Sequence, residues 1–236
     1  MAGARWASGA RLRKEAMALP QATAEYRAEY RAARIGPRYS GWAHFAFVTG
    51  MCAAAICLAA SQLHEVRLWE LALVPLYFVV ANAAEYFGHR GPMHHPRLLL
   101  RALYTRHTLE HHRFFTHEAM ECESPRDFKI MLFPPVLLLF FLGGIATPLS
   151  LLCRVLVSPN AGWLFAITGV GYYLTYEWLH FAYHLPTTSW VGKLALVRVL
   201  RKNHLAHHDP SLMTRWDFNI TFPLCDLVLG TLRRAP

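Results

Sequence analysis

The chain has 236 residues, of which 54% are hydrophobic and 17% are charged, and its formal net charge is +9 at pH 7. A soluble domain usually has about a quarter charged residues, so this composition, with a mean hydropathy of +0.21, argues against a soluble fold and for an integral membrane protein. Attraction to anionic lipid beside a membrane accounts for the positive charge. A nucleic acid partner is therefore not expected.

The first segment, residues 1–40, is rich in Ala and Arg and has no apolar stretch of the kind found in a secretory signal. Its acidic residues, Glu15, Glu25 and Glu29 among them, also fit a transit peptide poorly. We expect a basic amphipathic helix on the cytoplasmic membrane surface. Residues 41–236 are then a single membrane-embedded domain.

Four apolar segments follow, each near the ~20 residues that cross a bilayer as a helix. They lie at about residues 41–61, 68–87, 130–153 and 161–182, and the first and third contain no charged residue. The predicted fold class is therefore all-α, a polytopic membrane protein with four transmembrane helices.

The positions of Lys and Arg predict the orientation. Eight lie before the first apolar segment, seven between the second and third and seven after the fourth, whereas the other two connections hold only Arg67 and Arg154. Positive charge marks the cytoplasmic side, so both termini and the middle loop should be cytoplasmic. The excess of Arg over Lys hints at a bacterial genome, and we expect the inner membrane of a bacterium.

Histidine is the most unusual feature of the sequence. Of fourteen histidines, twelve fall in four clusters, all on the side predicted to be cytoplasmic. The clusters are EYFGHRGPMHHP (85–96), RHTLEHHRFFTHE (106–118), EWLHFAYH (177–184) and NHLAHHDP (203–210). The remaining two, His44 and His64, lie near the ends of the first apolar segment and are expected to be interfacial.

The spacing within the clusters predicts metal binding, because residues three or four apart share one helical face. Such pairs are His107 with His111, His180 with His184, and His204 with His207. Each pair could chelate one ion, and the adjoining His112 and His208 could serve a second. Imidazole is a common ligand of iron, zinc and copper. In the pair His94 and His95 we favour His94, and for His117 a ligand, a supporting donor and a surface residue all stay open.

Acidic residues accompany the clusters. Glu85 precedes His89 by four residues and Glu177 precedes His180 by three, so each shares a helical face with its histidine. Ionisable residues at this depth are costly and usually functional. We expect both carboxylates, and Asp209 beside the last cluster, to act in catalysis by orienting metal-bound imidazoles. Direct ligation by the glutamates stays open.

The clusters as a set resemble the fatty acid hydroxylase and sterol desaturase superfamily of integral-membrane, histidine-rich dimetal oxygenases. The resemblance covers about residues 41–231, including the tail WDFNITFPLCDLVLGT at 216–231. It implies a cytoplasmic cap of short helices over four membrane helices, with two metal ions held by His89, His94, His107, His111, His112, His180, His184, His204, His207 and His208. The chain departs from many members in having three residues, where they have two, between His107 and His111.

The resemblance also implies an activity: hydroxylation or desaturation of an alkyl carbon of a lipid or fatty-acyl substrate, with O2 and two iron ions, which zinc could replace in purified protein. Electrons should come from a separate donor protein of the ferredoxin or cytochrome type. The alternative is a zinc-dependent membrane hydrolase or another non-redox metalloprotein, although hydrolytic zinc usually has three protein ligands. Haem and metal-transport functions fit less well, because the histidines lie at the ends of the segments and the segments have few polar residues.

Overall fold

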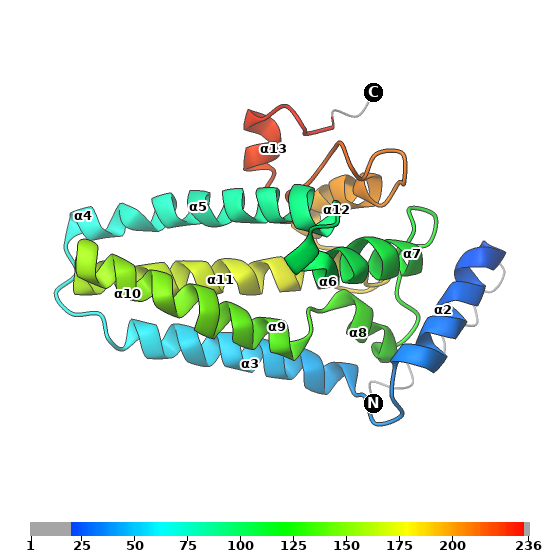
Figure 1. The fold of residues 1–236 in the computed structure, drawn as a ribbon, viewed down its shortest axis with the longest axis horizontal. Coiled ribbons are helices and arrows are strands. Elements are labelled where there is room, and N and C mark those ends of the chain that lie inside the picture. The colour runs from blue at the N-terminus through cyan, green and yellow to red at the C-terminus, as the bar shows by residue number, and fades with distance from the viewer. Residues whose placement is uncertain (1–19, 234–236) are drawn as a thin grey trace.

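A computed structural model describes residues 20–233 of the chain, and all its regular elements within that range are helices (Figure 1). Long helices run side by side, and shorter helices form a cap at one end of them. Of the basic segment predicted at residues 1–40, the part before residue 20 lies outside the described residues.

Three of the long helices are apolar and long enough to cross a membrane: Gly41–Ala60, Leu68–Met93 and Pro135–Leu156. The first is α3 (Gly41–Ala60). The second joins α4 (Leu68–Leu71), α5 (Leu73–Gly88) and the π-helical turn η1 (His89–Met93). The third joins α9 (Pro135–Phe140), the π-helical η5 (Phe141–Ala146) and α10 (Thr147–Leu156).

The third of these helices begins five residues later than the sequence predicted. Ile130 belongs instead to a short cap helix, α8 (Phe128–Met131), and the chain is extended after it. The reason is the Pro134–Pro135 pair. A residue that precedes proline is kept out of the helical region, whereas proline itself is well placed at the first turn of a helix.

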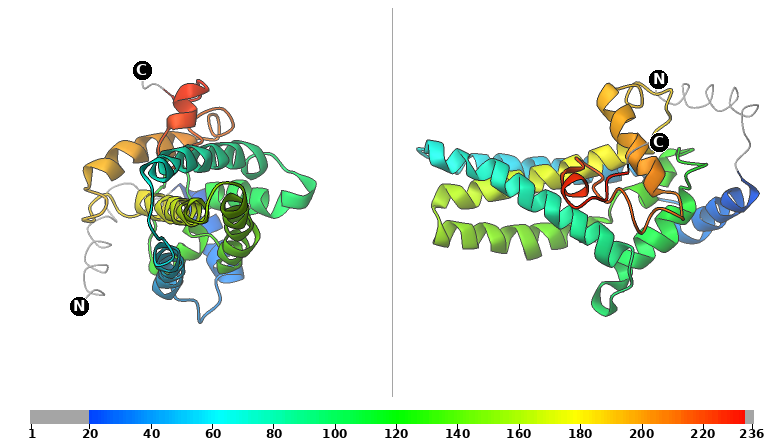
Figure 2. Two further views of the ribbon diagram at one scale, coloured as in Figure 1. Left: turned by 90° about the vertical axis from the view of Figure 1, so that its left-hand side faces the viewer. Right: turned by 90° about the horizontal axis from the view of Figure 1, so that it is seen from above.

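The fourth predicted segment forms α11 (Pro159–Tyr183), an uninterrupted α-helix of 25 residues. Viewed end on, it lies in the middle of the bundle, in contact with α3, α5 and α10 (Figure 2). Gly162 allows α10 to approach closely, since a Cβ there would lie 2.5 Å from the Ser150 carbonyl oxygen. The Ser150 hydroxyl donates a hydrogen bond to the Gly162 carbonyl at 2.7 Å.

The end of the bundle away from the cap carries the two short connections. Glu70 joins them: its carboxylate accepts hydrogen bonds from the Ser158 hydroxyl at 2.5 Å and the Asn160 amide at 3.1 Å. The single cations of the connections, Arg67 and Arg154, also lie at this end. The two hairpins are thereby fixed to one another.

The cap surrounds the opposite end. Its helices are α2 (Gln21–Arg34), η2 (Leu98–Leu100), α6 (Arg101–Tyr104), the π-helical η3 (Thr105–His111), α7 (His112–Phe114), η4 (Pro125–Asp127), α8, α12 (Ala195–His207) and α13 (Leu224–Val228). Tyr30 of α2 packs with Phe114 and Phe128 in the apolar core of the cap. The described part of the basic segment is therefore docked on the cap through this face.

Candidate metal centre

The ten histidines that the family resemblance singled out meet under the cap, and each is almost completely buried. Nine form two groups in which one nitrogen of each ring lies within 4.8 Å of the others. The first group is His89, His94, His107, His112 and His207; the second is His111, His180, His184 and His204. The tenth, His208, lies between them: its Nε2 is 3.1 Å from Nε2 of His204, and its ring stacks on His112 at 4.2 Å.

Two of the three adjacent HH pairs divide between the two sides, as their spacing indicated. His111 belongs to the second group and His112 to the first. His207 belongs to the first group, while His208 turns towards His204 of the second. Each pair therefore links the two halves of the centre.

The predicted pairing of His107 with His111 on one face is wrong, because η3 is a π-helix. The His112 N–H bonds to the carbonyl of His107, five residues back, so His107 and His112 share a face and His111 points into the other group. The extra residue of this motif is thus accommodated by the wider turn. His107 stays in the centre, with its Nε2 2.8 Å from Nε2 of His89.

The other two predicted pairs have different outcomes. His180 and His184 fall in one group, as an α-helix requires for residues four apart. His204 and His207 do not: they belong to different groups, and His204 approaches His208 instead. The pairing of His204 with His207 is therefore also wrong, and four-residue spacing governs α12.

Backbone carbonyls orient most of the imidazoles through the ring nitrogen that faces away from the centre. The Nδ1···O pairs are His89 with Phe218 (2.5 Å), His111 with Ile130 (3.0 Å), His180 with Met131 (3.1 Å), His184 with Met120 (2.9 Å), His207 with Trp216 (3.1 Å) and His208 with Phe115 (2.5 Å). A carbonyl can only accept, so each of these Nδ1 atoms carries the proton and each Nε2 is left with a free lone pair.

The Nε2 atoms of these rings and of the remaining imidazoles face one another. The Nε2···Nε2 distances are 2.8 Å for His89 and His107, 2.9 Å for His94 and His207, and 3.1 Å for each of the pairs His107–His112, His111–His180, His184–His204 and His204–His208. Facing lone pairs repel unless a cation lies between them. Two nitrogens bound to one ion at right angles lie about 3 Å apart, since metal–imidazole bonds are about 2.1 Å long. The donor set therefore fits a metal ion in each group.

The electrostatics favour the neutral, ligating form of the rings. Burial, reinforced by neighbouring imidazoles, lowers the pKa of His94 to about 2. Burial likewise lowers the pKa of His208 to about 3. It holds the pKa values of His107, His111 and His112 well below the usual histidine range. Neutral imidazole is the form that binds a metal.

In the part of the chain that the structure describes, the hydrogen bonds of the three acids go to groups other than the histidines, and their catalytic role stays a prediction. Glu85 accepts hydrogen bonds from the hydroxyls of Tyr172 and Thr221 and from the backbone N–H groups of Ile220 and Thr221. It therefore ties α5 to α11 and to the C-terminal tail.

Glu177 and Asp209 also bind groups other than histidine. Glu177 accepts long hydrogen bonds from the Phe133 N–H, at 3.3 and 3.4 Å, and also interacts with the Tyr173 hydroxyl. Asp209 accepts from the backbone N–H and hydroxyl of Ser211 at 2.8 and 2.6 Å, where it closes the turn after α12. Backbone carbonyl oxygens, in place of these carboxylates, bind the Nδ1 atoms of the imidazoles and orient the rings.

The remaining histidines lie outside the two groups. His64, His95 and His117 are exposed. His44 is buried, with its ring nitrogens 2.9 Å from the Tyr39 hydroxyl and 3.0 Å from the Phe133 carbonyl. The preference for His94 over His95 agrees with this placement.

The fold and the site together define a helical membrane protein with a histidine-rich metal-binding centre. The sequence model of the fatty acid hydroxylase family matches residues 74–231, well over half of the chain and all ten histidines, and the chain belongs to that family. Membership makes it an enzyme of the oxidoreductase type. No curated protein matches the chain.

A solved structure has a similar fold. It is described as full-length scs7p with only the hydroxylase domain visible, and it matches with a TM-score of 0.56 and 22% sequence identity, over 84% of this chain and 69% of that chain. At this identity the similarity concerns the fold alone. The arrangement of the helical bundle and its cap is therefore similar to that of the visible hydroxylase domain in that structure.

Proposed function

We propose that the protein is a membrane-bound di-iron oxygenase that hydroxylates an alkyl carbon of a lipid. The observation that carries the proposal is the pair of buried histidine groups, in which lone pairs of neutral imidazoles converge at 2.8–3.1 Å. Membership of the fatty acid hydroxylase family supports the reaction class.

In this proposal each histidine group holds one ion. The first would be bound by His89, His94, His107, His112 and His207, and the second by His111, His180, His184, His204 and His208. Two bound iron ions would supply the reactivity towards dioxygen that an unactivated C–H bond requires, with electrons from a separate donor protein. Ten imidazoles exceed the three protein ligands usual for hydrolytic zinc, which disfavours the hydrolase.

A small cavity of about 20 Å³ beside the histidines has room for about one methylene group, and there we place the carbon of the alkyl chain that is oxidised. It is bounded by imidazoles of both groups, His107, His111 and His180, and by apolar side chains that include Leu132 and Phe133. Such walls bind hydrocarbon and exclude water. The ring of Tyr176 stacks on Phe133 with centroids 5.6 Å apart, which fixes the wall next to His180.

The membrane arrangement is also part of the proposal. We place α11 as a fourth membrane helix, because it lies among the three candidate spans and they cover it (Figure 2). Neighbouring helices shield its polar residues from lipid. The Lys and Arg distribution puts the cap on the cytoplasmic side. Labelling of single cysteines at His95 and His64 from each side of the membrane tests this: only the former should react from the cytoplasm.

The decisive experiment combines metal analysis, oxygen consumption and mass spectrometry of lipids from cells with and without the protein. We expect two iron ions per chain, consumption of O2 and a lipid heavier by one oxygen atom. A lipid lighter by two hydrogens would mark the protein as a desaturase instead. Bound zinc with no oxygen consumption and cleaved lipids would refute the proposal in favour of the hydrolase.

A further inference from the structure

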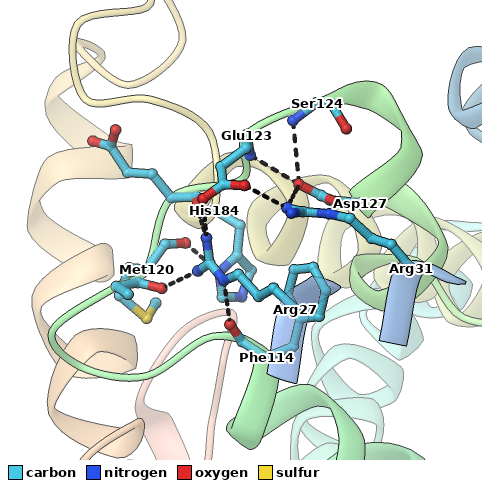
Figure 3. Close-up of polar contacts among 10 residues, drawn as sticks. Arg27, Arg31, Phe114, Met120, Glu123, Ser124, Asp127 and His184 are labelled. Atoms are coloured by element: carbon cyan, nitrogen blue, oxygen red, sulfur yellow. Dashed lines mark hydrogen bonds and ion pairs between the residues drawn. The ribbon is translucent and has the colours of Figure 1, made fainter. Parts of the chain in front are cut away.

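Arg27 of α2 is the largest fully buried side chain in the described part of the protein, with 1% of it exposed. Its guanidinium group donates to three backbone carbonyls: Nε to Phe114 at 2.7 Å, Nη1 to Glu121 at 3.2 Å and Nη2 to Ala119 at 2.5 Å (Figure 3). Nη1 also lies 3.2 Å from the Glu123 carboxylate. A buried charge is costly unless it is paired and fully hydrogen-bonded, and these contacts meet that condition.

The carbonyls that Arg27 binds lie next to two of the carbonyls that orient histidines. Phe114 precedes Phe115, whose carbonyl accepts from His208 Nδ1 at 2.5 Å. Ala119 and Glu121 flank Met120, whose carbonyl accepts from His184 Nδ1 at 2.9 Å. The guanidinium therefore fixes the backbone beside both acceptors.

Between α7 and η4 the loop has little regular structure to hold it in place, only one isolated bridge from Thr116 to Ala119. Its far end is secured separately. Arg31 binds the Asp127 carboxylate through two nitrogens at 2.8 and 2.9 Å and the Glu123 carboxylate at 2.7 Å (Figure 3). None of these ion pairs and hydrogen bonds involves a residue next to Phe115 or Met120. The Arg31 guanidinium does lie 5.3 Å from the ring centroid of Phe114, but it binds no backbone carbonyl there.

We propose that Arg27 is a positioning residue of the metal centre, which fixes the Phe115 and Met120 carbonyls and through them His208 and His184. Both histidines face the second group, so Arg27 controls one of the two ions. The proposal rests on the two-ion function above. It brings into the centre a helix that lies outside the family-matched residues 74–231.

The test uses the full chain in detergent, stripped of metal and titrated with Fe(II), and with Co(II) for its visible spectrum. Arg27→Lys keeps the charge but replaces a planar fork of donors by a single ammonium group that cannot span three carbonyls. We expect it to weaken one of the two metal-binding steps by about 10-fold, the lower end for partners outside the ligand set, and to change the Co(II) bands of that ion alone. Arg27→Gln should have a larger effect of the same kind.

Arg31→Gln is the matched control, because it removes a neighbouring cation of the same helix that also binds Glu123. It should leave both binding steps within about 2-fold of the unchanged protein, below the effect of an outer partner. If Arg27→Gln does not fold, as judged by gel filtration, Arg27→Lys decides.

Two unweakened binding steps in Arg27→Lys would overturn the inference, as would equal weakening of both steps in Arg27→Lys and Arg31→Gln. A failure of the proposed function looks different. In that case the unsubstituted protein itself binds fewer than two ions, and the inference falls with it.

Discussion

The two histidine groups are similar in composition but are held by different parts of the chain. In the first group the outer nitrogens of His89 and His207 donate to Phe218 and Trp216, both in the C-terminal tail. In the second group the acceptors for His111, His180 and His184 lie between residues 120 and 131. The two histidine groups are therefore held by separate parts of the chain, and a substitution in one part should abolish metal binding by one group and not by the other.

The largest expected effect comes from removing one ligand on each side, His111→Ala and His207→Ala. Each should lower lipid oxidation by more than about 100-fold, beyond the usual effect of partners outside the ligand set, and each should cost one bound ion. Metal analysis and product mass spectrometry measure both. The control His64→Ala, exposed and remote from the centre, should change neither. Full product formation by either variant would refute the ligand assignment.

A substitution in the C-terminal tail should affect the first histidine group and leave the second unchanged. Asp226 accepts hydrogen bonds from the N–H groups of Phe218 at 3.0 Å and Asn219 at 2.7 Å, and so fixes the carbonyl that orients His89. Asp226→Ala should lower the free energy of unfolding by about 3 kcal/mol, since bonds to a charged acceptor are strong. It should also weaken metal binding by the first group. Selective loss of the second ion would contradict the division.

The two membrane acids should differ from one another, although the sequence gives them matching positions. Glu85→Gln disturbs four close hydrogen bonds and should destabilise the protein by about 2 kcal/mol. Glu177→Gln keeps an acceptor for the long contact with Phe133 and should cost less than about 1 kcal/mol. Thermal unfolding in detergent compares them. Equal effects, or a greater one at Glu177, would show that Glu177 has a role its contacts do not reveal.

The smallest effect is expected for His95→Ala and His117→Ala. Both side chains are exposed, although each belongs to a histidine cluster in the sequence. Metal content and activity should stay unchanged. Loss of a metal ion in either variant would show that this histidine is a ligand, and would contradict its assignment outside the two groups.

Much of this centre could be predicted from the sequence, because two clusters of histidine at the ends of apolar segments and two more in the following loop and tail leave few other interpretations. The adjacent histidines of the HH pairs also indicated that two metal ions could be bound. The acceptors for Nδ1 could not be predicted, since any residue type offers a carbonyl, and Met120 or Ile130 carries no polar side chain to draw attention. Arg27 was not singled out in the sequence, because nothing in a basic segment distinguishes an arginine that is buried. The pairing of His107 with His111 failed because spacing alone does not separate α from π turns. The pairing of His204 with His207 failed because spacings of three and of four residues both fit one face of an α-helix.

The π turn at η3 has a consequence for recognising similar proteins. One additional residue in a regular helix would rotate everything after it by about 100°, and would carry His112 away from its partners. Here the wider turn takes up that residue locally, so the direction of the following side chains is preserved. Sequence searches that require a fixed number of residues between histidines would miss such chains. A search of structures for histidines that lie close together in space would find them.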